Sequence, residues 1–138
     1  MRYFVVVDTN VIVSALLAGS KPSPTKEIML YIFSGSIVPL LNEEIIKEYE
    51  DVLKREKFGF IKEDIRFVID NIKQKGINCE RTFSPEFFPD MKDKVFYEIA
   101  LSKEDSYLVT GNKRHFPIVP RVVTPAEMVM IVQNTTVR

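Results

Sequence analysis

The sequence has little of several residue types that mark particular kinds of protein. Its 138 residues include one cysteine (Cys79), one histidine (His115) and no tryptophan. A single cysteine excludes an internal disulfide, and one cysteine with one histidine argues against a structural zinc site, which needs four such ligands. No histidine lies near Cys79 in the sequence, so we expect this cysteine to fill space in the core rather than act as a nucleophile.

Net charge and long apolar runs are also absent. Lysine plus arginine and aspartate plus glutamate each number 19, so the formal net charge is zero. A general nucleic-acid binder would carry a basic excess, and any contact with nucleic acid must therefore come from local patches. No apolar stretch reaches the roughly 20 residues of a membrane helix, and the N-terminus has no signal-peptide cleavage pattern. We expect a cytoplasmic protein that does not enter a membrane.

What is present suits one globular domain. Hydrophobic residues make up 46% of the sequence and charged residues 28%, which is enough apolar material for a core. The length is close to the commonest domain size, and the chain has no internal repeat or low-complexity tract. We therefore expect a single domain over residues 1–138.

Strand-like and helix-like segments alternate along the chain. Buried-strand patterns occupy residues 3–7, 36–41, 106–110 and 121–123, with a weaker candidate at 77–80. Helical patterns occupy residues 11–17, 24–34, 43–56, 62–76, 93–103 and 124–132. Pro39 suggests that the second strand lies at an edge or ends there. The alternation is typical of an α/β layered fold with a mainly parallel central sheet.

Polar residues follow two of the expected strands. Asp8 comes directly after residues 3–7, and Asn112 follows residues 106–110 after one glycine. In parallel α/β sheets, ligands bind beyond the carboxyl ends of the strands. The two side chains would share one crevice if these strands are neighbours.

Acidic residues on two helices could join this crevice. On a helical wheel Glu48 and Glu50 lie at opposite margins of one apolar face, and the wheel does not choose between them. Asp93 continues the buried stripe of its own helix at the N-terminal end. Each carboxylate also has an ordinary explanation, as a helix cap for Asp8 and Asp93 and as a solvated helix face for Glu48.

Together these carboxylates predict a cation site. Several carboxylates in one place raise one another's pKa unless a cation neutralises them. An oxygen-rich site without histidine or cysteine suits a hard ion such as Mg²⁺ or Mn²⁺. Such ions commonly position phosphate and a nucleophilic water, which is the chemistry of phosphodiester hydrolysis.

Four segments resemble the PIN domain in order and spacing. They are VVVDTNVIVSALL (5–17), NEEIIKEYEDVL (42–53), DMKDKVFYEIAL (90–101) and SYLVTGNKRHFP (106–117). More narrowly, the chain is similar to the toxin components of toxin–antitoxin pairs, and the resemblance covers nearly all of it. The resemblance implies a three-layer α/β/α fold and a metal-dependent endoribonuclease that uses Mg²⁺ or Mn²⁺.

The resemblance also implies roles for individual residues. By position, the catalytic and metal-binding residues would be Asp8, Glu48, Asp93 and Asn112. This choice favours Glu48 over Glu50. The supporting residues, which would hold a ligand or a bound water by hydrogen bonding, would be Thr9, Asn10 and Thr110.

Asn112 departs from the family pattern, because many PIN domains have aspartate at this position. An asparagine still offers a carbonyl oxygen, but the site loses one negative charge, and we expect weaker metal binding. The alternative is a catalytically weak or inactive PIN domain that acts as an RNA- or protein-binding module. Asp90 and Asp105 are interpreted as surface acids rather than replacements for the missing charge.

The resemblance further implies partners, namely an RNA substrate, a cognate antitoxin protein and a second copy in a homodimer. The residues placed to bind substrate phosphates are Lys113, Arg114 and His115, and the alternative for them is a solvated basic turn.

Aromatic residues are expected mainly in the core. Those of the proline-bearing segment 83–88 could stack on bases, but packing onto the core is the favoured interpretation. Four others fall on helical stripes and are expected to be buried: Phe33, Tyr49, Phe67 and Phe96.

Overall fold

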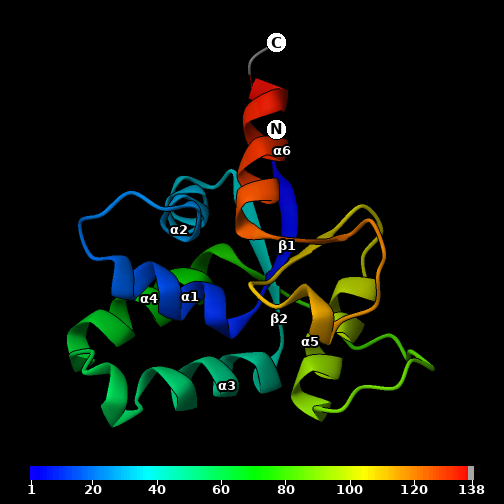
Figure 1. Cartoon of the computed structure of the whole chain (residues 1–138), viewed down its shortest axis with the longest axis horizontal. Coiled ribbons are helices and arrows are strands. Elements are labelled where there is room, and N and C mark those ends of the chain that lie inside the picture. Colours follow the sequence, from blue (N-terminus) through cyan, green and yellow to red (C-terminus); the bar gives the residue numbers. More distant parts are fainter. Residues whose placement is uncertain (137–138) are drawn as a thin grey trace.

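Helices and strands alternate along the chain, and the strands form one sheet (Figure 1). The computed structural model describes the backbone of residues 1–136 and the side chains of residues 1–134. The strands are β1 (Tyr3–Val7), β2 (Ile37–Leu41), β3 (Ile77–Asn78), β4 (Tyr107–Val109) and β5 (Val122–Val123). The helices are α1 (Thr9–Ala18), α2 (Pro24–Ser34), α3 (Glu43–Leu53), α4 (Lys62–Lys75), α5 (Met91–Leu101) and α6 (Pro125–Thr136), with short 3-10 turns η1 (Glu56–Phe58) and η2 (Lys113–His115).

The sheet has five strands in the order β3-β2-β1-β4-β5, and every pair of neighbours is parallel. From β1 the chain moves outward to β2 and β3, then returns to place β4 on the other side of β1. The direction of winding therefore reverses between β1 and β4. In open parallel sheets, this reversal is where ligands bind, at the carboxyl ends of the strands.

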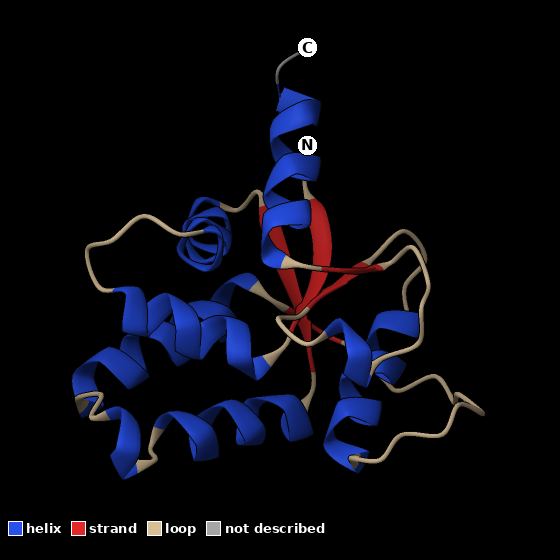
Figure 2. Cartoon of the chain, in the orientation of Figure 1, coloured by secondary structure: helices blue, strands red, loops and turns tan. Residues whose placement is uncertain are grey.

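Helices cover the sheet on both sides, which confirms the predicted three-layer α/β/α fold. Helices α2 and α4 contact β2, while α1 and α6 pack against α2. Helix α5 contacts β1, β2 and β4. Figure 2, in the orientation of Figure 1, shows the strands with α1, α2 and α4 on one side and α5 on the other.

The predicted apolar stripes form the core of the molecule. The valines of β1 are buried on both faces of the sheet, as a continuous β-branched run predicts. The stripes of α3 and α4 are buried along their length: Ile45, Tyr49, Val52, Leu53, Ile65, Val68, Ile69 and Ile72. Among the described residues, no helix is long and apolar enough to cross a membrane.

Side chains cap the first turns of α3 and α6. The side chain of Asn42 accepts a hydrogen bond from the Ile45 N–H at 2.8 Å and so begins α3. At the start of α6, Thr124 and Glu127 form a capping box, in which each side chain accepts the other's backbone N–H at 3.1 and 2.8 Å.

Pro39 does not mark an edge strand, because β2 lies between β1 and β3. Strand β3 is short and pairs only with Leu40 and Leu41. The Pro39 carbonyl oxygen lies against Gly76, just before β3 begins. Pro39 has no N–H to donate, and at this position β2 has no paired strand on that side that would need one.

Two predictions about the helices were wrong. Helix α5 begins at Met91 rather than at residue 93, because Asp90 is the N-cap and accepts the Lys92 N–H at 2.9 Å. Asp93 therefore lies within the first turn of α5. Phe67 is not a core residue but 59% exposed, and its ring meets that of Phe33 edge-on at 5.7 Å.

Candidate functional site

Asp8 is placed at the reversal point of the sheet, directly after β1. Its backbone is extended, and its Oδ1 accepts the Thr9 N–H at 2.8 Å, so it is the N-cap of α1. The ordinary explanation of this aspartate is therefore correct. Its side chain is also buried, and capping uses only one of its two carboxylate oxygens.

The second oxygen of Asp8 joins the ends of β1 and β4. Oδ2 accepts hydrogen bonds from the Thr110 hydroxyl at 2.7 Å and from the Asn10 amide at 3.3 Å. The Thr110 hydroxyl oxygen in turn accepts the Asn112 N–H at 2.9 Å, and Asn10 Oδ1 accepts the Gly111 N–H at 3.1 Å. The residues expected to support the site thus form a network that sets the orientation of the Asp8 carboxylate.

This environment disfavours the charged form of Asp8. Burial raises the pKa of its carboxyl group, and the hydrogen bonds from Thr110 and Thr9 offset only part of that effect. His115 also lowers the pKa, and the negative charge of Glu48 raises it. Among the described residues, no lysine or arginine forms an ion pair with Asp8.

Glu48 and Glu50 face different neighbours, which the helical wheel could not distinguish. Glu48 faces α5, where it shares a surface pocket with Val95 and Phe96, and its carboxylate lies 3.5 Å from Lys92 Nζ. Its negative charge also acts on Asp8 and Asp93.

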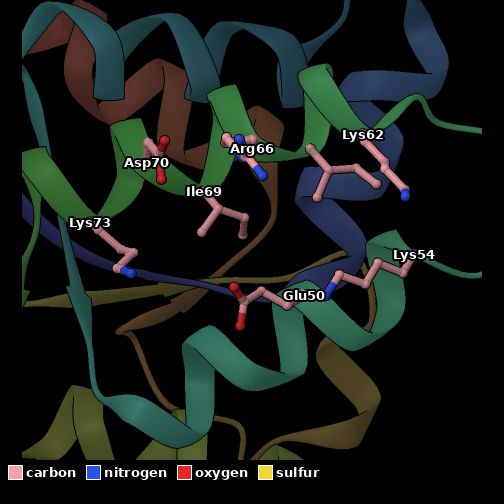
Figure 3. A pocket seen from close by; sticks show the side chains of 8 residues that line it. Glu50, Lys54, Lys62, Arg66, Ile69, Asp70 and Lys73 are labelled. Carbon is pink, nitrogen blue, oxygen red and sulfur yellow. The ribbon is translucent and has the colours of Figure 1, made fainter.

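Glu50 instead lines a groove of about 350 Å³ between α3 and α4. Figure 3 shows it on α3, below Arg66 and Lys73 of α4. Glu48, not Glu50, is therefore the glutamate on the side of α5.

Asp93 completes a group of three carboxylates. Its side chain is 18% exposed, and its Oδ2 lies 3.6 Å from His115 Nδ1. Burial, together with the negative charges of Asp8, Asp90 and Glu48, raises the pKa of Asp93 to about 6, against an opposing effect of His115. A strand end and two helices thus bring together three acidic side chains whose charges act on one another.

Sequence reasoning missed the polar contact of Tyr49, which it placed in the core without a polar role. This fully buried side chain donates a hydrogen bond from its hydroxyl group to the Val7 carbonyl oxygen, at the end of β1. Its ring also lies 6.1 Å from that of Phe96 on α5. Tyr49 therefore positions α3, and with it Glu48, beside Asp8. The available signal was a tyrosine rather than a phenylalanine on a buried stripe, because a buried hydroxyl requires a partner.

The segment after β4 is the exposed side of the site. Asn112 is exposed, and η2 follows it with three basic side chains on the surface. Lys113 is in an ion pair with Glu127 at 3.2 Å, and His115 is the neighbour of Asp93 described above. Arg114 is exposed beside them. The roles expected for these residues in substrate binding stay predictions.

The donor chemistry of the site fits a hard divalent cation. The four residues predicted as ligands offer only oxygen atoms, and the buried Thr9 hydroxyl has no hydrogen-bond partner within the described chain. No three Asp, Glu, His or Cys side chains of the described residues are gathered closely enough to enclose an ion. Mg²⁺ does not require such a cage, because it binds through one or two carboxylates and keeps several waters.

Fold and site together define a doubly wound α/β protein with an acidic site at the point where the winding of its sheet reverses. The sequence model of the PIN domain matches residues 4–114, which include Asp8, Glu48, Asp93 and Asn112. The chain belongs to the PIN domain family, a family of nucleases whose members generally use divalent metal ions. No curated protein matches the sequence.

Proposed function

We propose that the protein is a metal-dependent endoribonuclease that hydrolyses phosphodiester bonds in RNA with Mg²⁺ or Mn²⁺. The observation that carries the proposal is the approach of Asp8, Glu48 and Asp93 from three separate elements. Burial and the neighbouring negative charges raise the pKa of both aspartates. Ionisable groups perturbed in this way are characteristic of functional sites, and here the arrangement lies in a member of a nuclease family.

Each residue of the site has a role in this proposal. Asp8, Glu48 and Asp93 hold the ion, and Asn112 offers a neutral oxygen. A bound Mg²⁺ or Mn²⁺ supplies charge stabilisation for the phosphate and lowers the pKa of a water molecule. Thr110 and Asn10 hold the Asp8 carboxylate in one orientation through their hydrogen bonds. Because the Asp8 carboxylate is already oriented, it needs little rearrangement when the ion and the substrate bind.

The basic η2 turn binds substrate phosphates in this proposal. Lys113 and Arg114 are exposed, and the ion pair between Lys113 and Glu127 is on the surface, where such pairs contribute little stability. Lys113 can therefore exchange Glu127 for a phosphate group at small cost. His115 lies closest to the carboxylates, so it contacts the phosphate nearest the site.

A cleavage assay tests the activity. Purified protein is incubated with a mixed panel of labelled RNAs in Mn²⁺, in Mg²⁺ and in chelator, beside Asp8→Asn and the matched control Asp70→Asn, which changes an exposed acid on α4. We expect cleavage that requires metal, is lost in Asp8→Asn and is kept in Asp70→Asn. Equal cleavage by all three proteins would indicate a contaminating ribonuclease and would contradict the proposal.

Asn112 favours a second candidate, a PIN domain that binds RNA or protein without cutting. The two candidates are separated by Asn112→Asp, which restores the negative charge that many family members have. Cleavage by the unmodified protein shows that asparagine is tolerated. Cleavage only by Asn112→Asp would show that one lost charge has silenced the site, and RNA binding without cleavage by either protein would support the second candidate.

We also propose that the protein is the toxin of a toxin–antitoxin pair and forms a homodimer. An apolar groove of about 330 Å³ over α1, α2 and α4, which includes Leu16, Met29 and Leu30, supports a role in protein association.

The toxin proposal is tested by inducing the protein in a bacterial host. Growth should stop for the unmodified protein, continue for Asp8→Asn, and resume when a small protein encoded by the adjacent gene is co-expressed. Light scattering of the purified chain measures the dimer.

A further inference from the structure

Two exposed phenylalanines lie on the loop that leads into α5. Phe83 is 77% exposed and Phe87 is 87% exposed, whereas Phe88 is buried. The prediction that this loop packs onto the core is therefore correct for Phe88 and wrong for the other two. Pairs of large aromatic side chains left in water are unusual unless they meet a ligand or partner.

Each exposed phenylalanine is followed by a residue that the fold holds in place, Ser84 after Phe83 and Phe88 after Phe87. The Ser84 N–H donates to the buried Glu98 carboxylate at 2.7 Å, which fixes the loop beside Phe83. The ring of Phe88 packs between those of Tyr97 and Phe116, at centroid distances of 5.5 and 6.1 Å, which fixes the loop beside Phe87. The two rings are therefore presented on an ordered backbone, so binding would need little further ordering of the loop.

The loop lies beside the candidate site. Lys94, the residue after Asp93, places its Nζ 5.6 Å from the centre of the Phe83 ring. Phe116, which holds Phe88, directly follows His115, the neighbour of Asp93. Figure 1 shows the loop and the η2 turn on the side of the sheet covered by α5.

We propose that Phe83 and Phe87 form a stacking platform for the bases of single-stranded RNA at the edge of the site. The inference rests on the proposed ribonuclease function and specifies the form of its substrate. Every base has a flat π face, so an aromatic ring binds an unpaired base with little sequence preference.

Basic side chains lie near the rings, together with one acid of the loop itself, Glu86, whose carboxylate accepts the Ser84 hydroxyl at 2.8 Å. Lys94, at the start of α5, lies beside Phe83, Lys92 of the same turn pairs with Glu48, and Arg114 lies on η2. Cations interleaved with aromatic rings are the usual composition of single-strand binding surfaces, because the rings bind the bases while the cations bind the phosphates. A duplex hides its base faces within the stack, so the platform selects unpaired segments.

The test measures binding in the Asp8→Asn background, where RNA stays intact. Fluorescence anisotropy compares a labelled single-stranded RNA, its duplex and a strand of equal length with abasic positions. Phe83→Ala and Phe87→Ala should each weaken single-strand binding roughly five-fold or more. Phe67→Ala, which removes an exposed phenylalanine from α4, is the matched control and should bind as its parent does. Both alanine variants should have little effect on the abasic strand.

Two further substitutions separate stacking from general apolar contact. Phe87→Trp keeps an aromatic face and should bind at least as tightly as phenylalanine, whereas Phe87→Leu keeps the apolar character but should bind as weakly as alanine. If leucine binds as well as phenylalanine, or if the double alanine variant matches the Phe67→Ala control, the platform is overturned. The same holds if the protein binds single strands no more tightly than duplex.

Cleavage by the active protein distinguishes failure of the platform from failure of the proposed function. Metal-dependent cleavage with an unchanged KM in Phe83→Ala/Phe87→Ala would leave the ribonuclease standing and overturn the platform. Weakened single-strand binding in these variants without any cleavage by the parent would support the platform and contradict the ribonuclease. If no RNA binds, the platform is overturned, and the two rings are then better explained as a protein contact.

Discussion

Two buried carboxylates of this protein, Asp8 and Glu98, have opposite electrostatic environments. They are almost equally inaccessible, with exposures of 7% and 4%. Burial raises the pKa of Asp8, and its hydrogen bonds do not compensate. Burial acts on Glu98 in the same direction, but hydrogen bonds from Ser84 and Arg81 and the charge of Arg81 outweigh it, so the pKa of Glu98 is lowered.

The difference lies in the partners. Glu98 Oε1 accepts hydrogen bonds from the Arg81 guanidinium at 2.8 and 2.9 Å, and its Oε2 accepts the Ser84 N–H at 2.7 Å. Asp8 receives hydrogen bonds only from neutral donors, and its charged neighbours His115 and Glu48 act on its pKa in opposite directions. Within the described residues, Glu98 is thus fully compensated and structural. Among the same residues, Asp8 has no lysine or arginine partner, and the favourable effect of His115 does not offset its burial, which is the property expected of a carboxylate that binds a cation.

The largest effect on stability is expected when the compensation of Glu98 is removed. An amide has one acceptor oxygen instead of two, so Glu98→Gln leaves either Arg81 or the Ser84 N–H facing a donor. We expect a loss of about 2 to 3 kcal/mol in the free energy of unfolding. Urea unfolding at neutral pH measures it. A loss below about 0.5 kcal/mol, within the usual range of surface substitutions, would show that Glu98 is not structural.

At the site around Asp8, the substitution Asn112→Asp supplies the negative charge that many PIN domains have at this position. A fourth carboxylate group makes the site more negative, and affinity for hard cations increases with the number of charged ligands. We expect Mn²⁺ to bind about tenfold more tightly, a change of about 1.4 kcal/mol. Calorimetric titration against the unmodified protein measures it. Unchanged affinity would mean that position 112 is not a ligand position.

A third substitution relieves repulsion instead of adding charge. The pKa of Asp93 is raised to about 6, so in the metal-free protein its ionised form opposes folding above that pH. Asp93→Asn should therefore increase stability in chelator at pH 7.5 by on the order of 1 kcal/mol. Thermal unfolding measures the gain. The same variant should lose the stabilisation that Mn²⁺ gives the unmodified protein.

The stability gain of Asp93→Asn depends on pH, because the pKa of Asp93 is raised in the folded protein. As the pH falls through 6 toward the unfolded value of about 4, the folded protein takes up a proton at Asp93 and the repulsion disappears. The difference between Asp93→Asn and the unmodified protein should shrink over this range. Glu98 has the opposite slope, because its lowered pKa provides stability above the unfolded value that is lost in acid. A constant difference from pH 7.5 to 4 would contradict the assignment to Asp93.

Much of the fold and part of the site could be predicted from the sequence. Parallel strands have continuous apolar patterns, and a polar residue after such a strand has to lie at the carboxyl edge of the sheet. The positions of Asp8 and Asn112 follow from this local rule. The start of α5 does not, because Asp90 and Asp93 are both suitable caps and only the folded backbone distinguishes them.

The remaining features depend on contacts between distant segments. Glu48 and Glu50 differ only in whether α5 or α4 packs beside them, and a wheel of α3 contains neither helix. Likewise Phe88 is buried because Phe116 lies opposite, whereas Phe87 next to it has no such neighbour. The ion pair between Arg81 and Glu98 also leaves no local pattern in the sequence, because one residue lies on a loop and the other on a helix.

The smallest effect is expected at Glu44, which shares Arg81 with Glu98. Arg81 Nη1 lies 3.2 Å from Glu44 Oε2, a distance similar to its contacts with Glu98, but the Glu44 side chain is 54% exposed. Water screens this pair and solvates the glutamate when the pair opens, so Glu44→Gln should cost less than about 0.5 kcal/mol. The same urea unfolding as for Glu98→Gln measures it, and the two glutamates share Arg81 but differ in burial and in the Ser84 N–H, which only Glu98 accepts. Losses of equal size would mean that contact with Arg81, rather than burial and the Ser84 bond, determines the energy, and the contrast between Glu98 and Asp8 would then need another cause.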